Sequence, residues 1–286
     1  ADGGEGGGGG GWPAEAAREG AAAARARLLE MLNRAGDRLI SSPPSYPMDL
    51  STLKETAETL KMLEELLKIH ELSLEGPGKG SVEGNKHQGA DSQMEEDQSL
   101  MNQMCSALIE PLLRMCRLSA EGLAPSDMAA FMLNNAAAAA AALGSFQGTT
   151  LWKQKISSEI DVWLDCLVEN EYESMLDSCG LKNVVNLMEV CRNRPDPLSA
   201  QPGLDVDNLT TAMTRFYSSI FTLVMPDFDK VQQSSIKIQA RQRTALALAN
   251  AHEAIYEMVT DDKNHYSTRS FLQHTPQQVR VLLDCD

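Results

Sequence analysis

Positive charge is what this sequence has too little of. Its 286 residues include 25 Lys and Arg against 40 Asp and Glu, which gives a formal net charge of −15 at pH 7. Proteins that bind nucleic acid or anionic lipid need an excess of basic side chains to neutralise phosphates. The composition therefore argues against both kinds of surface, and we expect no contact with nucleic acid.

Long apolar runs and aromatic side chains are also scarce. No stretch stays apolar over the roughly 20 residues that a membrane-spanning helix requires. Aromatic residues make up 5% of the chain, whereas Ala, Leu and Met are abundant, and this balance favours helices over strands. The start is acidic and glycine-rich, so we expect no secretory signal there. Because the first residue is Ala1 rather than Met, we also expect a piece of a longer protein.

Closely spaced cysteine pairs, which would suggest a metal site or a disulfide, are missing as well. None of the six cysteines forms a CxxC pair, and most lie within helical patterns. A thiol in such a position usually behaves as a small buried apolar group. We therefore expect free thiols in a reducing, cytosolic compartment.

Two partial zinc-hydrolase motifs lack their second histidine. His70-Glu71 and His252-Glu253 are followed by Leu74 and Tyr256 at the position one turn later, where a second His would be needed. No nucleophile motif or phosphate-binding loop stands out either. We predict no catalytic, metal-binding or cofactor-binding residue, and a helical metal-dependent hydrolase with ligands from elsewhere stays a less favoured alternative.

The apolar residues recur every three or four positions, which predicts an all-α fold. No convincing alternating strand pattern is present. The expected helices run from just after Pro13 to about Ile40, from a capping box at Thr52 and Glu55 to Leu74, from Ser99 onward, from a cap at Ser126 or Asp127 to Leu143, from Thr150 to Ser178 with a stop at Gly180, from Leu181 to Arg194, from a cap at Asp205 or Asp207, and from about Asp229 to Thr260.

The clearest local signal is the start of the last helix. Thr275, Pro276 and Gln278 provide a cap residue, a proline in the first turn and a glutamine at the third helical position. Apolar Val279, Leu282 and Leu283 follow. The sequence predicts a short, well-capped helix with one apolar face.

Composition divides the chain into four parts. We expect residues 1–13 to be a disordered, glycine-rich segment and residues 14–74 to be the helical end of a preceding domain. Residues 75–98 are rich in Gly and charge, which predicts a low-complexity linker. Residues 99–286 are expected to form a C-terminal helical-bundle domain.

Two further features of the sequence can be interpreted either structurally or functionally. The alanine run 136–142 favours close helix packing, because small side chains allow neighbouring helices to approach. Lys237, Arg241 and Arg243 on one predicted helix form a small basic patch. Such a patch is usually a solvated face, and docking of an acidic partner is the alternative.

Two sequence blocks carry a resemblance to a known family. The first runs from Leu112-Leu113-Arg114-Met115-Cys116 into Ser126-Asp127-Met128-Ala129-Ala130-Phe131-Met132-Leu133-Asn134. The second is the closing Phe271-Leu272-Gln273-His274-Thr275-Pro276-Gln277-Gln278-Val279-Arg280-Val281-Leu282-Leu283. Their order and spacing resemble the C-terminal part of subunit 6 of the conserved oligomeric Golgi complex. The resemblance covers roughly Ser106 to the end.

This resemblance implies a subunit of a vesicle-tethering complex, with a fold made of successive helical bundles in an elongated rod. It implies a non-catalytic role in intra-Golgi retrograde vesicle transport and Golgi protein transport, at the cytosolic face of the Golgi membrane. The implied partners are other subunits of the complex together with SNAREs and Rab GTPases, which would provide peripheral membrane association. The family's N-terminal coiled coil is expected to lie outside this piece.

The residues that we expect to serve interaction or structure within the two blocks are Ser126, Asp127, Met128, Phe131, Thr275, Pro276, Gln278, Val279, Leu282 and Leu283. The alternative to a tether subunit is a general cytosolic helical adaptor or scaffold, which would share only the Leu- and Ala-rich helices.

Overall fold

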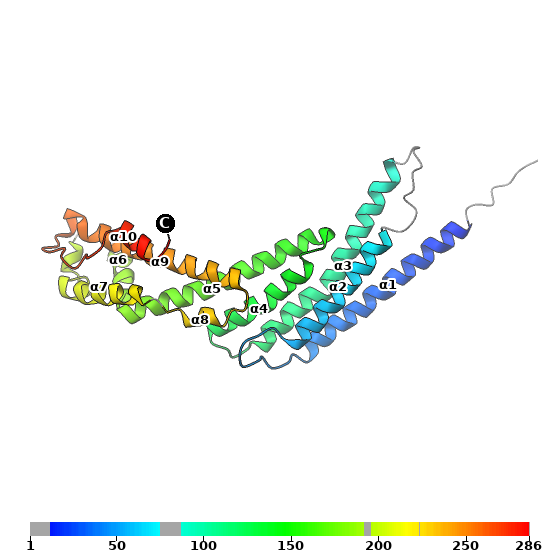
Figure 1. Cartoon of the computed structure of the whole chain (residues 1–286), viewed down its shortest axis with the longest axis horizontal. Helices are drawn as coiled ribbons and strands as arrows, with labels where there is room; N and C mark the ends of the chain where they lie inside the picture. The colour runs from blue at the N-terminus through cyan, green and yellow to red at the C-terminus, as the bar shows by residue number, and fades with distance from the viewer. Residues whose placement is uncertain (1–11, 75–86, 192–195, 223, 286) are drawn as a thin grey trace, which may run out of the picture. The chain divides into compact units, whose positions relative to one another are not determined.

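The computed structural model describes residues 12–74, 87–191, 196–222 and 224–285 (Figure 1). Within these ranges every regular element is a helix, which confirms the all-α prediction. The expected disordered segment 1–13 lies outside the described residues, except for Trp12 and Pro13, which begin the first helix.

The α-helices are α1 (Trp12–Ser41), α2 (Lys54–Leu74), α3 (His87–Ser119), α4 (Pro125–Leu143), α5 (Thr150–Cys179), α6 (Leu181–Cys191), α7 (Val206–Phe221), α8 (Pro226–Asp229), α9 (Ser234–Thr260) and α10 (Pro276–Leu282). Three single turns of 3-10 helix are η1 (Gln147–Thr149), η2 (Leu198–Ala200) and η3 (Asp262–Asn264).

The predicted helix from about Asp229 to Thr260 is wrong at its start. The chain forms the single turn α8, leaves the helical path, and begins α9 only at Ser234. Side-chain hydrogen bonds explain the break. Nδ2 of Asn134 donates to the carbonyl of Lys230 at 2.9 Å, and the N–H of Gln232 donates to Oδ1 of Asn134 at 2.7 Å. These backbone groups are satisfied without a helix, so the helix does not continue through them.

Two other helix starts differ from the prediction. Helix α4 begins at Pro125, so Ser126 and Asp127 lie in its first turn rather than at the cap, and proline suits that first position because it lacks only an N–H that would be unpaired there. Helix α3 begins at His87, inside the segment 75–98 that was expected to be a linker. Residues 75–86 lie outside the described residues, and the division of the chain into domains stays a prediction.

The chain folds into two compact units, each made of several segments. The first contains residues 52–121 and 135–158 together with the N-terminal part of the chain to Pro47. The second contains residues 48–51, 122–134 and 159–286. The helices that flank residues 75–98 therefore belong to the same unit.

In the first unit, α1 and α2 pack against α3. Fully buried leucine and methionine side chains from α2 and α3 form the core: Leu63, Leu67, Met104, Leu108, Leu112 and Met115. Complete burial of such a side chain contributes roughly 1.5–3 kcal/mol to folding. These residues recur at helical spacing, as the apolar stripes in the sequence predicted.

The alanine run belongs to the first unit, and most of its side chains are buried there. Ala136, Ala139 and Ala142 are buried, whereas Ala141 is exposed. The packing interpretation of the run is therefore confirmed on one side of α4. Beside the run, buried Asn135 accepts hydrogen bonds from the N–H of Leu53 at 3.1 Å and from the hydroxyl of Thr56 at 2.8 Å.

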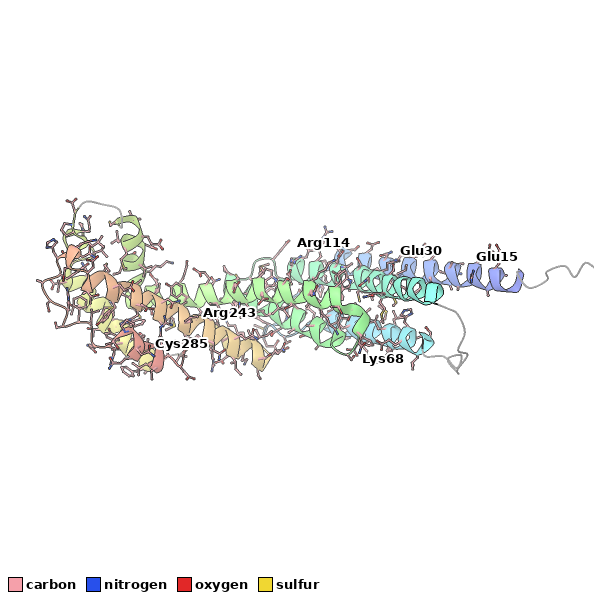
Figure 2. All side chains as sticks on the ribbon, turned by 90° about the horizontal axis from the view of Figure 1, so that it is seen from above. Glu15, Glu30, Lys68, Arg114, Arg243 and Cys285 are labelled. Atoms are coloured by element: carbon pink, nitrogen blue, oxygen red, sulfur yellow. The ribbon has the colours of Figure 1, made fainter. Side chains whose placement is uncertain are left out.

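The second unit contains α6, α7, α8, α9 and α10, with α10 packed on α9 and α7 in contact with α6. Its largest fully buried side chains include Phe131, Phe216 and Phe228. Gly180 has a φ of 76° and ends α5, as its position predicted, because a left-handed residue stops a helix and glycine adopts it without a steric penalty. Arg243, labelled in Figure 2, forms ion pairs with Asp161 and Asp165 on α5.

Candidate docking surface on the C-terminal helix

A complete capping box holds the start of α10. The N–H of Gln278 donates to the hydroxyl of Thr275 at 3.3 Å, and Oε1 of Gln278 accepts from the N–H of Thr275 at 2.9 Å. Pro276 occupies the first helical position. A helix of seven residues is too short to be stable alone, so this cap and its packing on α9 decide whether it forms. The predicted cap is confirmed.

Helix α10 buries one face and exposes another. Val279 and Leu283 are buried, while Val281 is 59% exposed and Leu282 is 40% exposed. Arg280 fixes the helix to α9 through Glu253 Oε2 at 2.7 Å and Asn250 Oδ1 at 2.9 Å.

An aromatic cluster lies beneath the segment that leads into α10. The hydroxyl of Tyr217 is 2.9 Å from Nε2 of His252, whose ring stacks on Phe216. The ring of His274 meets Tyr217 edge-on, with 5.0 Å between centroids. Burial, together with the neighbouring His274, lowers the pKa of His252 to about 4, and burial raises the pKa of Tyr217 to about 12. Both side chains are therefore neutral near pH 7, as suits a structural core.

The exposed side of α10 continues onto the end of α7. Phe221 is 62% exposed, and its ring centroid lies 6.1 Å from that of His274. His274, Val281 and Leu282 line a shallow hollow of about 340 Å³ with Gln277 and Gln278. We call Phe221, His274, Gln277, Val281 and Leu282 the α10 surface. Its apolar side chains and two polar groups suit a contact with another protein.

The residues of the first motif block that lie at the start of α4 contact a part of the second unit other than α10. The carboxylates of Asp127 and Asp227 both hold the ammonium group of Lys230, with the Asp227 contact at 2.7 Å. Burial lowers the pKa of Lys230, but the two carboxylates outweigh this effect and raise it above its ordinary value. Ser126 and Met128 are half-buried and Phe131 is fully buried, so Phe131 stabilises the core and is not available to a partner.

Two residues that organise this region were not singled out from the sequence. Asn134 donates to the carbonyl of Leu50 at 2.8 Å as well as to Lys230, and Glu171 is a buried carboxylate. Burial and the charge of Asp227 raise the pKa of Glu171, while Lys230 lowers it. A pair of asparagines, Asn134 and Asn135, inside an apolar helix was the available signal for the first of them, because such side chains must find partners when buried.

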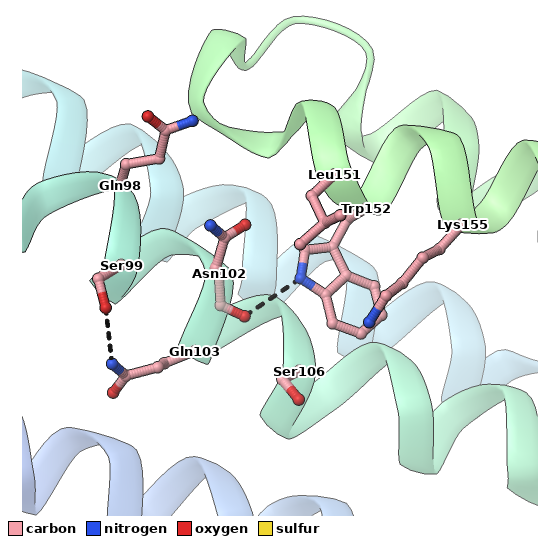
Figure 3. Close-up of a pocket in the computed structure, with 8 residues that line it drawn as sticks. All are labelled: Gln98, Ser99, Asn102, Gln103, Ser106, Leu151, Trp152 and Lys155. Carbon is pink, nitrogen blue, oxygen red and sulfur yellow. Dashed lines mark hydrogen bonds between the residues drawn. The ribbon is translucent and has the colours of Figure 1, made fainter. Parts of the chain in front are cut away.

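A more polar hollow lies in the first unit, between α3 and the start of α5 (Figure 3). Trp152 donates its indole N–H to the carbonyl of Asn102 at 3.2 Å, and the ammonium of Lys155 lies 4.1 Å from the indole ring. Gln103 donates to the hydroxyl of Ser99 at 3.0 Å. Trp152 is buried, and its hydrogen bond to the backbone of Asn102 joins α5 to α3.

The predicted basic patch is engaged within the chain. Arg241 pairs with Asp229 at 3.4 Å, Arg243 pairs with two aspartates of α5, and the ammonium of Lys237 donates to the carbonyl of Asp229. The structure therefore favours the structural reading of this patch over docking of an acidic partner.

Metal-ligating side chains do not gather within the described ranges. There, no three His, Cys, Asp or Glu side chains lie close enough to share an ion. His252 belongs to the aromatic cluster, and the six cysteines are free thiols. Across the same ranges, none of the helices has the length and apolar character needed to span a bilayer.

The described residues thus define an all-α protein whose long helices pack through leucine, methionine and alanine. The model of the family "Conserved Oligomeric Golgi complex subunit 6, C-terminal" matches residues 14–283, and the chain belongs to this family. The match begins far before Ser106, so the narrower extent expected from the sequence is corrected.

Curated relatives support the same family. The proteins named conserved oligomeric Golgi complex subunit 6 are 27% identical over 241 residues in Bos taurus and 26% identical over 257 residues in Rattus norvegicus. The one in Arabidopsis thaliana is 23% identical over 301 residues. These alignments cover 83%, 88% and 91% of this chain but 34%, 36% and 42% of the relatives, so the chain spans little more than a third of their length. No solved structure matches the chain significantly.

Proposed function

We propose that this chain is the C-terminal helical part of a non-catalytic subunit of a Golgi vesicle-tethering complex. The observation that carries the proposal is the family match over residues 14–283, which includes both motif blocks. In this role the subunit acts in intra-Golgi retrograde transport, at the cytosolic face of the Golgi membrane. It binds other subunits of the complex and the SNARE and Rab proteins of the vesicle.

The architecture of the described residues suits this role. A tether holds surfaces at a distance and needs several docking faces, and long helices provide length at about 1.5 Å per residue while each bundle keeps a local core. The polar clusters around Lys230 and Asn134 are closed by their own hydrogen bonds and ion pairs. They therefore stabilise the helices rather than prepare a reaction.

The α10 surface is our proposed contact with another subunit of the complex. Interfaces are commonly anchored by a few aromatic and aliphatic side chains surrounded by polar groups. Phe221 and Leu282 have this character here, with Gln277 at the edge.

Co-precipitation of the full-length parent protein from a cell extract tests the proposal. The wild-type parent should enrich subunits of the Golgi tether, and a parent carrying Val281→Asp and Leu282→Asp should lose at least one of them. Both residues are exposed, so the variant should fold, which circular dichroism and the thermal midpoint would check. Leu283 is left unchanged because it is buried.

The matched control carries Ile69→Asp and Leu72→Asp, two exposed apolar residues of α2. It should retain every subunit. Loss of subunits in the control alone would assign the contact to α2 instead of α10. A wild-type parent that enriches no tether subunit would contradict the proposed function, and a set of partners outside the Golgi would favour the general helical adaptor.

A further inference from the structure

The second unit contains a groove that the proposed function does not use. It has a volume of about 790 Å³ and is lined by residues of α6 and of the C-terminal half of α9, together with residues of η2 and η3. A cavity of this size falls in the range of 300–1,000 Å³ that is typical of ligand sites. The α10 surface contributes no residue to it.

The floor of the groove is apolar and formed by small or flexible side chains. On α9, Ala251, Ala254 and Met258 recur at spacings of three and four, and on α6 Val185 and Met188 are three residues apart. Alanines leave space between the helices, and methionine adapts its shape to an incoming side chain. Two helices with facing apolar rows and a gap between them suit a third helix lying in the groove.

The rim of the groove is acidic. Among the described residues that line the groove, four carry carboxylates and one carries an ammonium group: Glu189, Asp196, Glu257, Asp261 and Lys263. Asp261 is partly occupied, because its carboxylate accepts the backbone N–H of Lys263 at 3.0 Å. Within the described ranges, no ion pair involves the carboxylates of Glu189, Asp196 or Glu257.

The acidic rim therefore favours an occupant with positive charge. An acidic rim attracts lysine and arginine and repels acidic segments, and the net charge of −15 attracts a basic partner over a longer range. An extended polar peptide would leave the apolar floor unpaired. A helix with apolar residues on one face and basic residues on the other satisfies both parts of the groove.

We propose that the groove between α6 and α9 binds an amphipathic helix with a basic polar face, supplied by a partner protein. This inference goes beyond the proposed function and does not depend on it, because it concerns another surface and is tested on the purified chain.

The test uses a fluorescent synthetic helix as a probe. The peptide has about 18 residues, or five turns, with leucine along one face and lysine along the other. A matched peptide replaces every lysine by glutamate. We expect saturable binding of the lysine peptide, measured by fluorescence anisotropy, with affinity that falls as salt screens the rim. The glutamate peptide should not bind.

Two variants locate the binding. Glu189→Lys with Glu257→Lys should weaken the affinity at least about tenfold, which corresponds to about 1.4 kcal/mol. Ala254→Trp should weaken it similarly by filling the groove, and since Ala254 is exposed the variant should fold. The control, Glu15→Lys with Glu19→Lys at exposed positions of α1, changes the net charge by the same amount outside the groove and should bind as the wild type does.

Several outcomes would overturn the inference. Equal weakening by the α1 control would reveal unspecific attraction, and unchanged binding by Ala254→Trp would place the peptide elsewhere. Binding of the glutamate peptide, or no binding of the lysine peptide, would exclude a basic helix as occupant. A dimer of the wild-type chain that Ala254→Trp dissociates, measured by sedimentation, would assign the groove to a second copy.

Discussion

Single polar side chains, buried or half-buried, set several local structures in this protein. Asn134 satisfies backbone groups of two separate segments, Asn135 satisfies the start of α2, and Lys230 holds two aspartates. Except for the pair of Lys230 with Asp227, these contacts join residues distant in the chain. The sequence shows which residue types are present, but not which backbone group each one meets.

Replacement of Asn134 by alanine should destabilise the protein by about 3 kcal/mol. The substitution removes hydrogen bonds to the N–H of Gln232 and to the carbonyls of Leu50 and Lys230, and each such bond contributes roughly 0.5–1.5 kcal/mol. Urea unfolding would measure the change. Asn183→Ala, at an exposed position of α6, is the control and should stay within about 0.5 kcal/mol of the wild type. Equal stability of the two variants would show that Asn134 is not a structural centre.

His252 should make the stability depend on pH. In the folded chain its pKa is lowered to about 4 from 6.5, by burial first and then by His274. Between these values the unfolded chain binds a proton that the native chain does not, so stability is complete above pH 6.5 and falls as the pH falls toward 4. The loss amounts to about 3 kcal/mol at one pKa unit per 1.36 kcal/mol.

Unfolding of the wild type and of His252→Gln from pH 7 to pH 4 would measure this contribution. Both proteins should lose stability as carboxylates protonate, and the wild type should lose the additional amount. Parallel curves for the two proteins would show that His252 takes up its proton without unfolding.

At the scale of helices, local signals determined most ends. The cap at Thr275 and the stop at Gly180 lie where the sequence predicts them, and Asp205 is one of the two caps predicted for α7, because each depends on neighbours within a few residues. The break between α8 and α9 could not be predicted in the same way. It depends on Asn134, about a hundred residues earlier in the chain.

Two glycines of α1 should respond in opposite ways to the same substitution. A Cβ at Gly36 would lie 2.5 Å from the carbonyl oxygen of Ala107 and 2.7 Å from Cγ of Pro111, both on α3, so Gly36→Ala should destabilise by about 1–3 kcal/mol. A Cβ at Gly20 would meet nothing within 4 Å, so Gly20→Ala should stabilise by about 0.5–1 kcal/mol.

Thermal unfolding of the two variants would compare these effects. Because the same chemical change is made in one helix, differences in helix propensity cancel between them. A stabilising Gly36→Ala would show that α1 and α3 do not approach as closely as the structure indicates.

At the scale of the whole molecule, the reactivity of each thiol depends on how deeply the packing buries it. Cys105 and Cys116 are fully buried, and burial raises their pKa values to about 12 and about 11. Cys285, labelled in Figure 2, and Cys166 are partly exposed. A thiolate forms readily only where water can reach it, so exposure and pKa act in the same direction.

Iodoacetamide labelling of the native protein should therefore modify Cys285 and Cys166 at least about 100-fold faster than Cys105 and Cys116. Mass spectrometry of the digested protein would give the rate for each residue, and urea should remove the difference. Equal rates in the native protein would show that the interior of the first unit opens freely.

The sequence by itself determined the fold class, most helix ends and the family. Helical periodicity and caps are local properties, and the two motif blocks can be read directly along the chain. Only the tertiary structure decided which candidate residues face outward. Val279 and Leu282 stand three residues apart on a short helix, yet one is buried on α9 and the other is exposed. That assignment depends on where α9 lies, and the acidic groove beside α6 likewise depends on how distant helices pack.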